Sequence, residues 1–200
     1  MILLLVSLVR AACPDATPLR QAFFGDLHVH THYSLDASVQ GTVTSHEQAY
    51  AFARGEELYV PHLDRTLALA EPLDFVGITD HAELLGELEI CHDPDQRGYR
   101  SASCGLLRRF PDTAFVVINA LLARKPRDRT EGLRRLRYCG SGGERCLSAA
   151  QAVWQQMVAQ ADQNNEPCAF TTFPAYEWSA SPRVDNLHRN VVFRDGNVPE

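Results

Sequence analysis

The stretch Gly25-Asp26-Leu27-His28-Val29-His30-Thr31-His32-Tyr33-Ser34-Leu35-Asp36 decides the fold. Residues 22–30 begin with apolar side chains and are predicted to form a short strand that ends in two histidines. Side chains at positions i and i+2 of a strand project to the same side, so His28 and His30 share a face. Two neutral imidazoles on one face are half of a metal site.

Two more predicted strands end in ionisable residues. Residues 74–81 end in Asp80 and His81, and residues 169–178 end with Glu177 next to a tryptophan. His188 then opens a fourth segment, whose apolar part at 189–193 is also predicted to be a strand. A lone histidine at a strand end is usually a surface or core residue, but three strand ends with metal-binding groups favour a common site.

Helices separate the predicted strands. Thr44 and Glu47 form a capping-box pattern, which predicts a helix over about 44–58. Ser148 caps a second helix, predicted over 148–163. Strands that alternate with helices indicate an α/β fold with parallel pairing. The carboxyl ends of parallel strands converge on one rim, so groups distant in sequence meet there.

The composition describes a globular protein of 200 residues, 45% of them hydrophobic, with a formal net charge of −6. An acidic surface lacks the basic field that duplex nucleic acid requires, so duplex nucleic acid is excluded as the main partner. The N-terminal apolar run is shorter than the roughly 20 residues that span a bilayer, so no transmembrane segment is predicted. The oligomeric state stays open.

Residues 1–21 are interpreted as a signal or leader segment, because small residues follow an apolar run. The alternatives are a mis-assigned start codon and a buried strand. The expected localisation is therefore secreted or periplasmic. Ala11-Ala12-Cys13 also has features of a lipoprotein cleavage site, which makes a lipoprotein the second localisation.

Six cysteines are many for a cytosolic chain of this size, and none stands in a Cys-x-x-Cys pair. Two local disulfides are sterically easy, Cys91 with Cys104 and Cys139 with Cys146, although six cysteines allow many pairings. If Cys13 is removed with a signal segment, five cysteines remain and one is odd, and Cys168, which lies in an apolar run, is then predicted to be a buried free thiol. This cysteine content favours an oxidising compartment.

Residues 91–146 are rich in Arg, Gly and Cys and are interpreted as an insertion. They have no sustained hydrophobic period of their own apart from an apolar patch at 114–123. The Arg-rich segment 124–137 within them is interpreted as a solvated helix face, with a phosphate-facing patch as the alternative.

The stretch quoted first resembles the first motif of the PHP superfamily, named for polymerase and histidinol phosphatase, and residues 75–81 resemble its second motif. Residues 174–179 and 186–193 resemble a PHP-related family, the domain of unknown function numbered 3604. The resemblance implies an α/β fold of the distorted, TIM-like (β/α)7 PHP type, here with a cysteine-containing insertion. It also implies divalent metal ions (zinc, manganese or iron), up to three in a complete barrel.

The chemistry of such a site suggests roles for Asp80 and Arg189, and the resemblance assigns the metal ligands. Asp80 is expected to orient an imidazole from behind, and Arg189 to bind a substrate phosphate, with surface salt-bridging as the alternative. The attacking group in such a site is a metal-bound hydroxide, because two bridged cations lower the pKa of a shared water. The metal ligands are His28 and His30 for the first ion, His188 for the second, Asp36 and His81 for the third, and Glu177 as the bridging carboxylate.

The sequence also departs from that family's pattern. A further histidine and a late Asp-x-His pair are expected, and neither follows His188. Four strands are predicted where a complete barrel has seven. Residues 22–200 are therefore predicted to be the N-terminal part of a PHP-like domain, and the chain a truncated product or incomplete record that need not be active alone.

These features predict a metal-dependent hydrolase, in its complete form a phosphoesterase that acts on a small-molecule phosphoester. An amidohydrolase-like enzyme is the second hypothesis, because it also starts with His-x-His. Such enzymes often bridge their metals with a carbamylated lysine, and the sole lysine, Lys125, lies in the Arg-rich insertion. The third hypothesis is a non-catalytic binding module stapled by disulfides.

Overall fold

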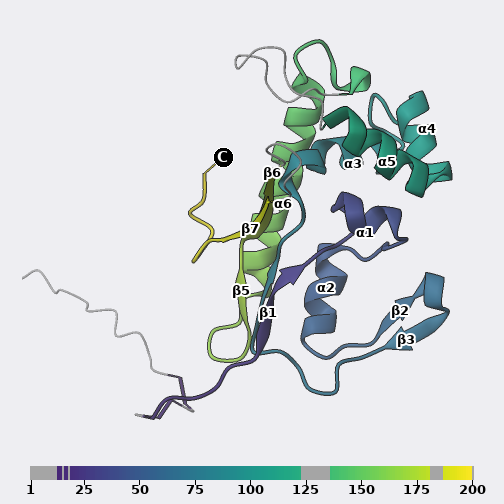
Figure 1. Ribbon diagram of the computed structural model, residues 1–200. Helices are drawn as coiled ribbons and strands as arrows, with labels where there is room; N and C mark the ends of the chain where they lie inside the picture. The colour runs from purple at the N-terminus through teal and green to yellow at the C-terminus, as the bar shows by residue number, and fades with distance from the viewer. Residues whose placement is uncertain (1–12, 15, 18, 123–135, 181–186, 200) are drawn as a thin grey trace, which may run out of the picture.

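The computed structural model describes residues 13–14, 16–17, 19–122, 136–180 and 187–199 (Figure 1). The strands are β1 (Gly25–Val29), β2 (Leu58–Val60), β3 (Arg65–Leu67), β4 (Phe75–Ile78), β5 (Thr171–Phe173), β6 (Ala175–Ala180) and β7 (Leu187–Val192). The helices are α1 (Leu35–Val39), α2 (His46–Ala53), α3 (Leu85–His92), α4 (Ala102–Arg109), α5 (Pro111–Leu122) and α6 (Glu144–Asn164). Short 3-10 helices are η1 (Pro61–Leu63), η2 (Ala82–Leu84) and η3 (Arg137–Cys139).

The central sheet has the order β1-β4-β5, and both pairings are parallel, as predicted. Strands β2 and β3 form one antiparallel hairpin, and β6 and β7 form another. The α/β class is therefore confirmed. The sheets of the described residues do not close into a barrel, so the (β/α)7 arrangement stays a prediction.

The single strand predicted over 169–178 is divided in two at Pro174. Strand β5 continues the parallel sheet, whereas β6 leaves it and pairs with β7. Proline has no N–H to donate to a neighbouring strand, so a sheet ladder is readily interrupted there. The interruption lets β6 carry Glu177 across the carboxyl end of β4, where Glu177 forms a parallel bridge with His81.

Both predicted helices exist, but their ends differ from the prediction. Helix α2 is capped by Ser45, whose capping box uses Gln48 and not Glu47. This helix ends at Ala53, because the chain turns at Gly55, where φ is +90°, into strand β2. Helix α6 begins at Glu144, before the predicted Ser148 cap, after a left-handed Gly143.

One face of α6 is buried along its length. Cys146, Ala149, Val153, Met157 and Ala161 recur every three or four residues and are all buried. In Figure 1, α6 is the long helix behind the strands.

The segment 91–146, interpreted as an insertion, contains helices in its described part although its sequence shows no sustained hydrophobic period outside 114–123. Helices α4 and α5 lie within it, grouped beside α3 in Figure 1. Leu107 and Ile118 from these helices pack with Leu88 and Cys91 of α3 in one apolar cluster. The Arg-rich segment lies almost wholly outside the described residues.

A second apolar cluster supports the candidate site. Val76 and Ile78 of β4 pack against Tyr50 of α2, Ala161 of α6 and Phe170. This contact holds the central strand between two helices, so the carboxyl end of β4 has a fixed position. No helix in the described part of the chain is long and apolar enough to span a membrane.

All six cysteines form disulfides. The pairs Cys91–Cys104 and Cys139–Cys146 are the two local ones expected. The prediction of a free Cys168 is wrong, because it pairs with Cys13. Cys168 lies exposed in the turn between α6 and β5, with φ +72°, and not in the apolar core that its neighbours suggested.

The Cys13–Cys168 bond ties a residue of the predicted leader to the end of α6. Lipidation of the Cys13 sulfur and this disulfide exclude each other, because both use the same atom. Three disulfides are typical of proteins that fold in an oxidising compartment.

We predict that the long-range disulfide stabilises the fold most. Its partners are 155 residues apart, against 7 for Cys139 and Cys146. Loop-closure entropy then gives about 5 kcal/mol for the first bond and about 2 kcal/mol for the second. Urea unfolding of the Cys13→Ser/Cys168→Ser and Cys139→Ser/Cys146→Ser double variants measures both, and an equal or reversed order would contradict the prediction.

Candidate metal centre

Four segments bring all six predicted ligands together. The carboxyl end of β1 supplies two histidines, and the start of α1 supplies Asp36. His81 lies in the short connection that follows β4. Glu177 and His188 come from the hairpin β6–β7. The convergence of strand ends expected from the sequence is therefore present.

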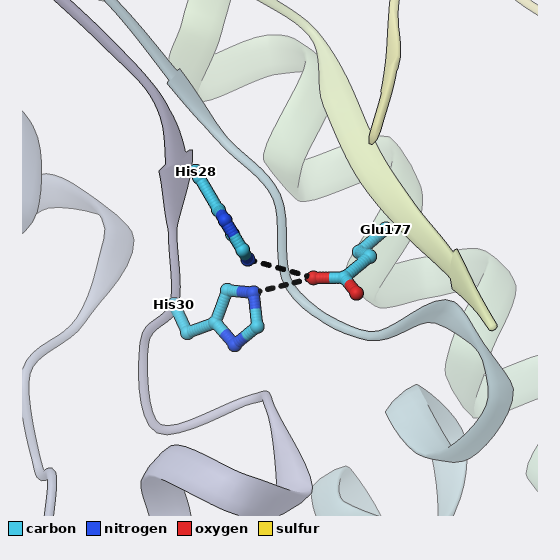
Figure 2. Close-up of side chains that lie close together, drawn as sticks. All are labelled: His28, His30 and Glu177. Atoms are coloured by element: carbon cyan, nitrogen blue, oxygen red, sulfur yellow. Dashed lines mark hydrogen bonds and ion pairs between the residues drawn. The ribbon is translucent and has the colours of Figure 1, made fainter. Parts of the chain in front are cut away.

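Glu177 is the centre of the cluster. Its side chain is only 1% exposed, and its Oε2 atom lies 3.1 Å from His28 Nε2 and 2.8 Å from His30 Nε2 (Figure 2). His28 and His30 lie on one face of β1 and point at the same oxygen, as the i and i+2 spacing predicts. His28 is 63% exposed, so this side of the cluster is open to solvent.

The other oxygen of Glu177 faces two different histidines. Oε1 is hydrogen-bonded to His188 Nδ1 and lies 3.9 Å from His81 Nδ1. Every ion-pair partner that the structure describes for Glu177 is a histidine. The carboxylate thus separates two pairs of imidazoles, one pair at each oxygen.

Asp36 contacts His30 from the side opposite Glu177. Its two oxygens lie 3.1 and 3.0 Å from His30 Nδ1, and its Oδ2 lies 3.8 Å from His81 Nε2. The two nitrogens of His30 therefore each face a carboxylate. A carboxylate behind a ligand imidazole fixes the orientation of the ring, so Asp36 can serve as a ligand or as the outer partner of His30.

Two serines belong to the cluster, and sequence reasoning missed both. Ser34 Oγ lies 3.2 Å from His30 Nδ1 and accepts a hydrogen bond from the backbone N–H of His81. Ser179 Oγ lies 2.8 Å from His81 Nδ1 and 3.3 Å from His188 Nδ1. Ser179 is two residues beyond Glu177 on β6, so the alternation rule that identified His30 from His28 also identifies Ser179.

Hydrogen bonds and charge outweigh burial in setting the ionisation of the two acids. Burial raises the pKa of Glu177, but the charge of His81 and hydrogen bonds from His188 and His30 bring the pKa below its ordinary value. Burial likewise raises the pKa of Asp36, and hydrogen bonds from His30 and Ser34 lower it well below its ordinary value. Both acids are therefore carboxylates at neutral pH.

Burial lowers the pKa of His30, but its contacts with both carboxylates raise the pKa above its ordinary value. The two carboxylates thus favour a positive charge at the point where the imidazole and carboxylate lone pairs converge. A divalent cation fits the same position, because its ligands are deprotonated carboxylates and neutral imidazoles.

The predicted phosphate ligand, Arg189, does not join the cluster. It pairs with Trp178 across the hairpin, one position from both Glu177 and His188. Successive side chains of a strand point to opposite faces, so Arg189 lies on the other face of the hairpin. It is exposed and donates to the His188 carbonyl. Asn190 takes the cluster-facing position and donates to the carbonyl of Leu27 at 2.7 Å.

Asp80 does not contact a ligand imidazole, which was its expected role. Its carboxylate instead accepts hydrogen bonds from Thr31 and His46. Three other histidines lie outside the candidate ligand set. His62 is exposed in η1, and His32 lies beside His92 with ring centroids 5.7 Å apart.

Three groups of side chains in this cluster could hold a metal ion, with ligand atoms within 4.8 Å of one another. They are His28–His30–Glu177, His30–Asp36–His81 and His81–Glu177–His188. A fourth group, Glu87–Cys139–Cys146, does not suit a metal, because both sulfurs are in a disulfide. Imidazole nitrogens with carboxylate oxygens suit zinc, iron or manganese. The donor set of the first three groups therefore fits a divalent transition metal.

The fold and this cluster define an α/β protein with a histidine- and carboxylate-lined candidate metal centre. Residues 17–200 match the family described as "Protein of unknown function (DUF3604)", so the chain belongs to that family. No curated protein and no solved structure gave a significant match. The resemblance to the domain of unknown function numbered 3604 is thereby confirmed.

We predict that acid destabilises the fold partly through His92. Burial lowers its pKa to about 4, and the charges of His32 and Arg108 add to this. The unfolded chain takes up a proton below about pH 6.5 and the folded chain only near pH 4, so the free energy of unfolding decreases as pH falls through this window, by up to about 3 kcal/mol.

Urea unfolding at several pH values between about 7 and 4 tests this, with His92→Gln compared with the wild type. The variant is expected to lose less stability over the window. The exposed His62→Gln variant is the matched control and is expected to keep the wild-type slope. Equal slopes for His92→Gln and the wild type would refute the assignment.

Proposed function

We propose that this chain forms the metal-binding part of a metal-dependent hydrolase of the PHP type, most consistent with a phosphoesterase. One observation carries the proposal, the division of the Glu177 carboxylate. Its Oε2 faces His28 and His30, and its Oε1 faces His188 and His81. This is the arrangement required of a carboxylate that bridges two metal ions, each with its own imidazoles.

A merely structural role explains Glu177 less well. A buried carboxylate is costly to a fold unless charged partners or hydrogen bonds compensate it, since desolvation of an unpaired charge costs several kcal/mol or more. The partners described for Glu177 are imidazoles, which are neutral or charged depending on pH. Two divalent cations compensate the carboxylate at all pH values at which the imidazoles are free to bind them.

When bound, such a pair of ions supplies Lewis acidity and activates water for attack near neutral pH. The chain's own residues have separate tasks. His28 and His30 would hold one ion with Glu177, and His81 and His188 would hold the other. Asp36 keeps the His30 ring turned toward Glu177.

A phosphoester substrate is supported by the resemblance to PHP motifs and by the open side of the cluster at His28. Arg189 lies on the opposite face of the hairpin, so this proposal leaves phosphate recognition to the cations. Bound cations supply a positive field that an acidic chain otherwise lacks. The chain's net charge of −6 is thus compatible with an anionic substrate.

The amidohydrolase hypothesis depends on Lys125, which lies outside the described residues. Glu177 already occupies the bridging position, and no observation favours a carbamylated lysine. The three disulfides support secretion or export to the periplasm as part of the proposal.

Metal content tests the proposal directly. The purified chain is expected to bind about two zinc or manganese ions, one for each oxygen of the bridging carboxylate. Glu177→Gln and the His28→Ala/His30→Ala double variant are expected to weaken binding by more than about 100-fold, because ligand loss costs more than loss of an outer partner. His62→Gln is the control and is expected to bind like the wild type. A folded wild type that binds no transition metal in calorimetric titration would overturn the proposal.

Substrate class requires a second measurement. We expect hydrolysis of generic phosphomonoesters or phosphodiesters by the metal-loaded protein, and none of amide substrates. Hydrolysis that requires metal and is lost in Glu177→Gln supports the phosphoesterase. Amide hydrolysis with the same dependence would replace it with the amidohydrolase hypothesis, and metal binding without either activity would favour the binding module.

A further inference from the structure

Asp80 is a fully buried carboxylate next to the candidate metal centre. Its side chain is 0% exposed and accepts three hydrogen bonds. The donors are the backbone N–H of Thr31 at 2.5 Å, the Thr31 hydroxyl at 2.7 Å and His46 Nε2 at 2.7 Å. Hydrogen bonds to an ionised acceptor are about twice as strong as neutral ones.

These contacts connect three of the four chain segments that carry the ligands. Thr31 directly follows His30 at the end of β1, and Asp80 directly precedes His81 at the end of β4. The backbone carbonyl of Asp80 also accepts a hydrogen bond from the N–H of Glu177, at 3.0 Å. Asp80 thus contacts the backbone next to His30 and the backbone of Glu177, and it directly precedes His81 in the chain.

Asp80 is the one hydrogen-bond partner that the described residues give the His46 side chain. Its side chain is 1% exposed, its ring stacks on Tyr33 with centroids 4.9 Å apart, and its Nδ1 is buried without a hydrogen-bond partner among the described residues. Burying an imidazole and a carboxylate costs desolvation, and replacing such a pair with apolar residues is often neutral or stabilising for a fold. The pair is therefore better explained by the geometry that it imposes than by stability.

We infer that Asp80 and His46 are positioning residues for the metal centre, and this inference rests on the proposed function. His46, carried by α2, holds the Asp80 carboxylate, and Asp80 holds the Thr31 segment against the end of β4. The distance between the His30 imidazole and His81 is set by this clamp. Neither Asp80 nor His46 ligates a metal ion.

The test follows Co²⁺ binding to the 200-residue chain. The visible d–d absorption of bound Co²⁺ reports the number and geometry of its ligands, which a residue that merely stabilises the fold does not alter in a folded variant. His46→Leu removes the donor to Asp80, whereas His46→Gln keeps an N–H donor in a similar place. His62→Gln is the exposed control, and near-UV circular dichroism shows that each variant is folded.

His46→Leu is expected to bind Co²⁺ about 10- to 100-fold more weakly, the range typical of lost outer-shell contacts. Its d–d spectrum is expected to differ from that of the wild type, and His46→Gln is expected to restore both affinity and spectrum. Should His46→Leu not fold, Thr31→Val decides, because it removes only the hydroxyl bond to Asp80. Thr31→Ser is its rescue variant.

A folded His46→Leu or Thr31→Val variant with wild-type affinity and spectrum would overturn the inference and leave the proposed function standing. A wild type that gives no Co²⁺ absorption, or one whose absorption persists in Glu177→Gln, overturns the proposed function and this inference with it. The two failures are therefore distinguishable.

Discussion

The candidate site depends on one buried carboxylate that has no permanently charged partner among the described residues. Glu177 is held on β6 by the hairpin, and four imidazoles approach its two oxygens. A carboxylate in this position is costly unless cations or protons compensate it. The surrounding strands are arranged so that their ends bring four imidazoles to this carboxylate.

The backbone around Glu177 meets that requirement through an interruption of the sheet. Pro174 ends the parallel ladder, and β6 then crosses the carboxyl end of β4. The crossing brings the N–H of Glu177 to the carbonyl of Asp80, whose side chain in turn holds the segment after β1. A rigid central strand between α2 and α6 keeps these short connections in place. The candidate site is thus supported by backbone and outer contacts as much as by its ligands.

Local rules predicted the parts of the site that lie within one segment. Alternation along a strand placed His28 and His30 on one face, and it would equally have indicated Ser179 from Glu177. Applied to β7, the same rule shows that Arg189 and His188 cannot both face the cluster. Applying the rule requires the extent and pairing of β7, and the sequence alone left both open. The predicted helix boundaries differ by a few residues, because the chain turns at Gly55 soon after α2 and because α6 begins directly after the left-handed Gly143.

Contacts between distant segments were beyond such rules. The pairing of Cys13 with Cys168 depends on the path of the chain around α6, and apolar neighbours wrongly suggested a buried thiol. The sequence of α2 gives no indication of the role of His46, because its partner is Asp80, which follows β4 in a distant part of the chain.

The sequence by itself determined the α/β class, and the resemblance of its motifs to known ones indicated the family and the six residues of the candidate centre. Only the tertiary structure decided which side chains contact one another in the candidate centre. It showed the two oxygens of Glu177 serving different imidazoles, Arg189 turned away, and Asp80 bound to His46. The reason is physical: the direction of a side chain follows from strand pairing, and strand pairing is a property of segments far apart in the chain.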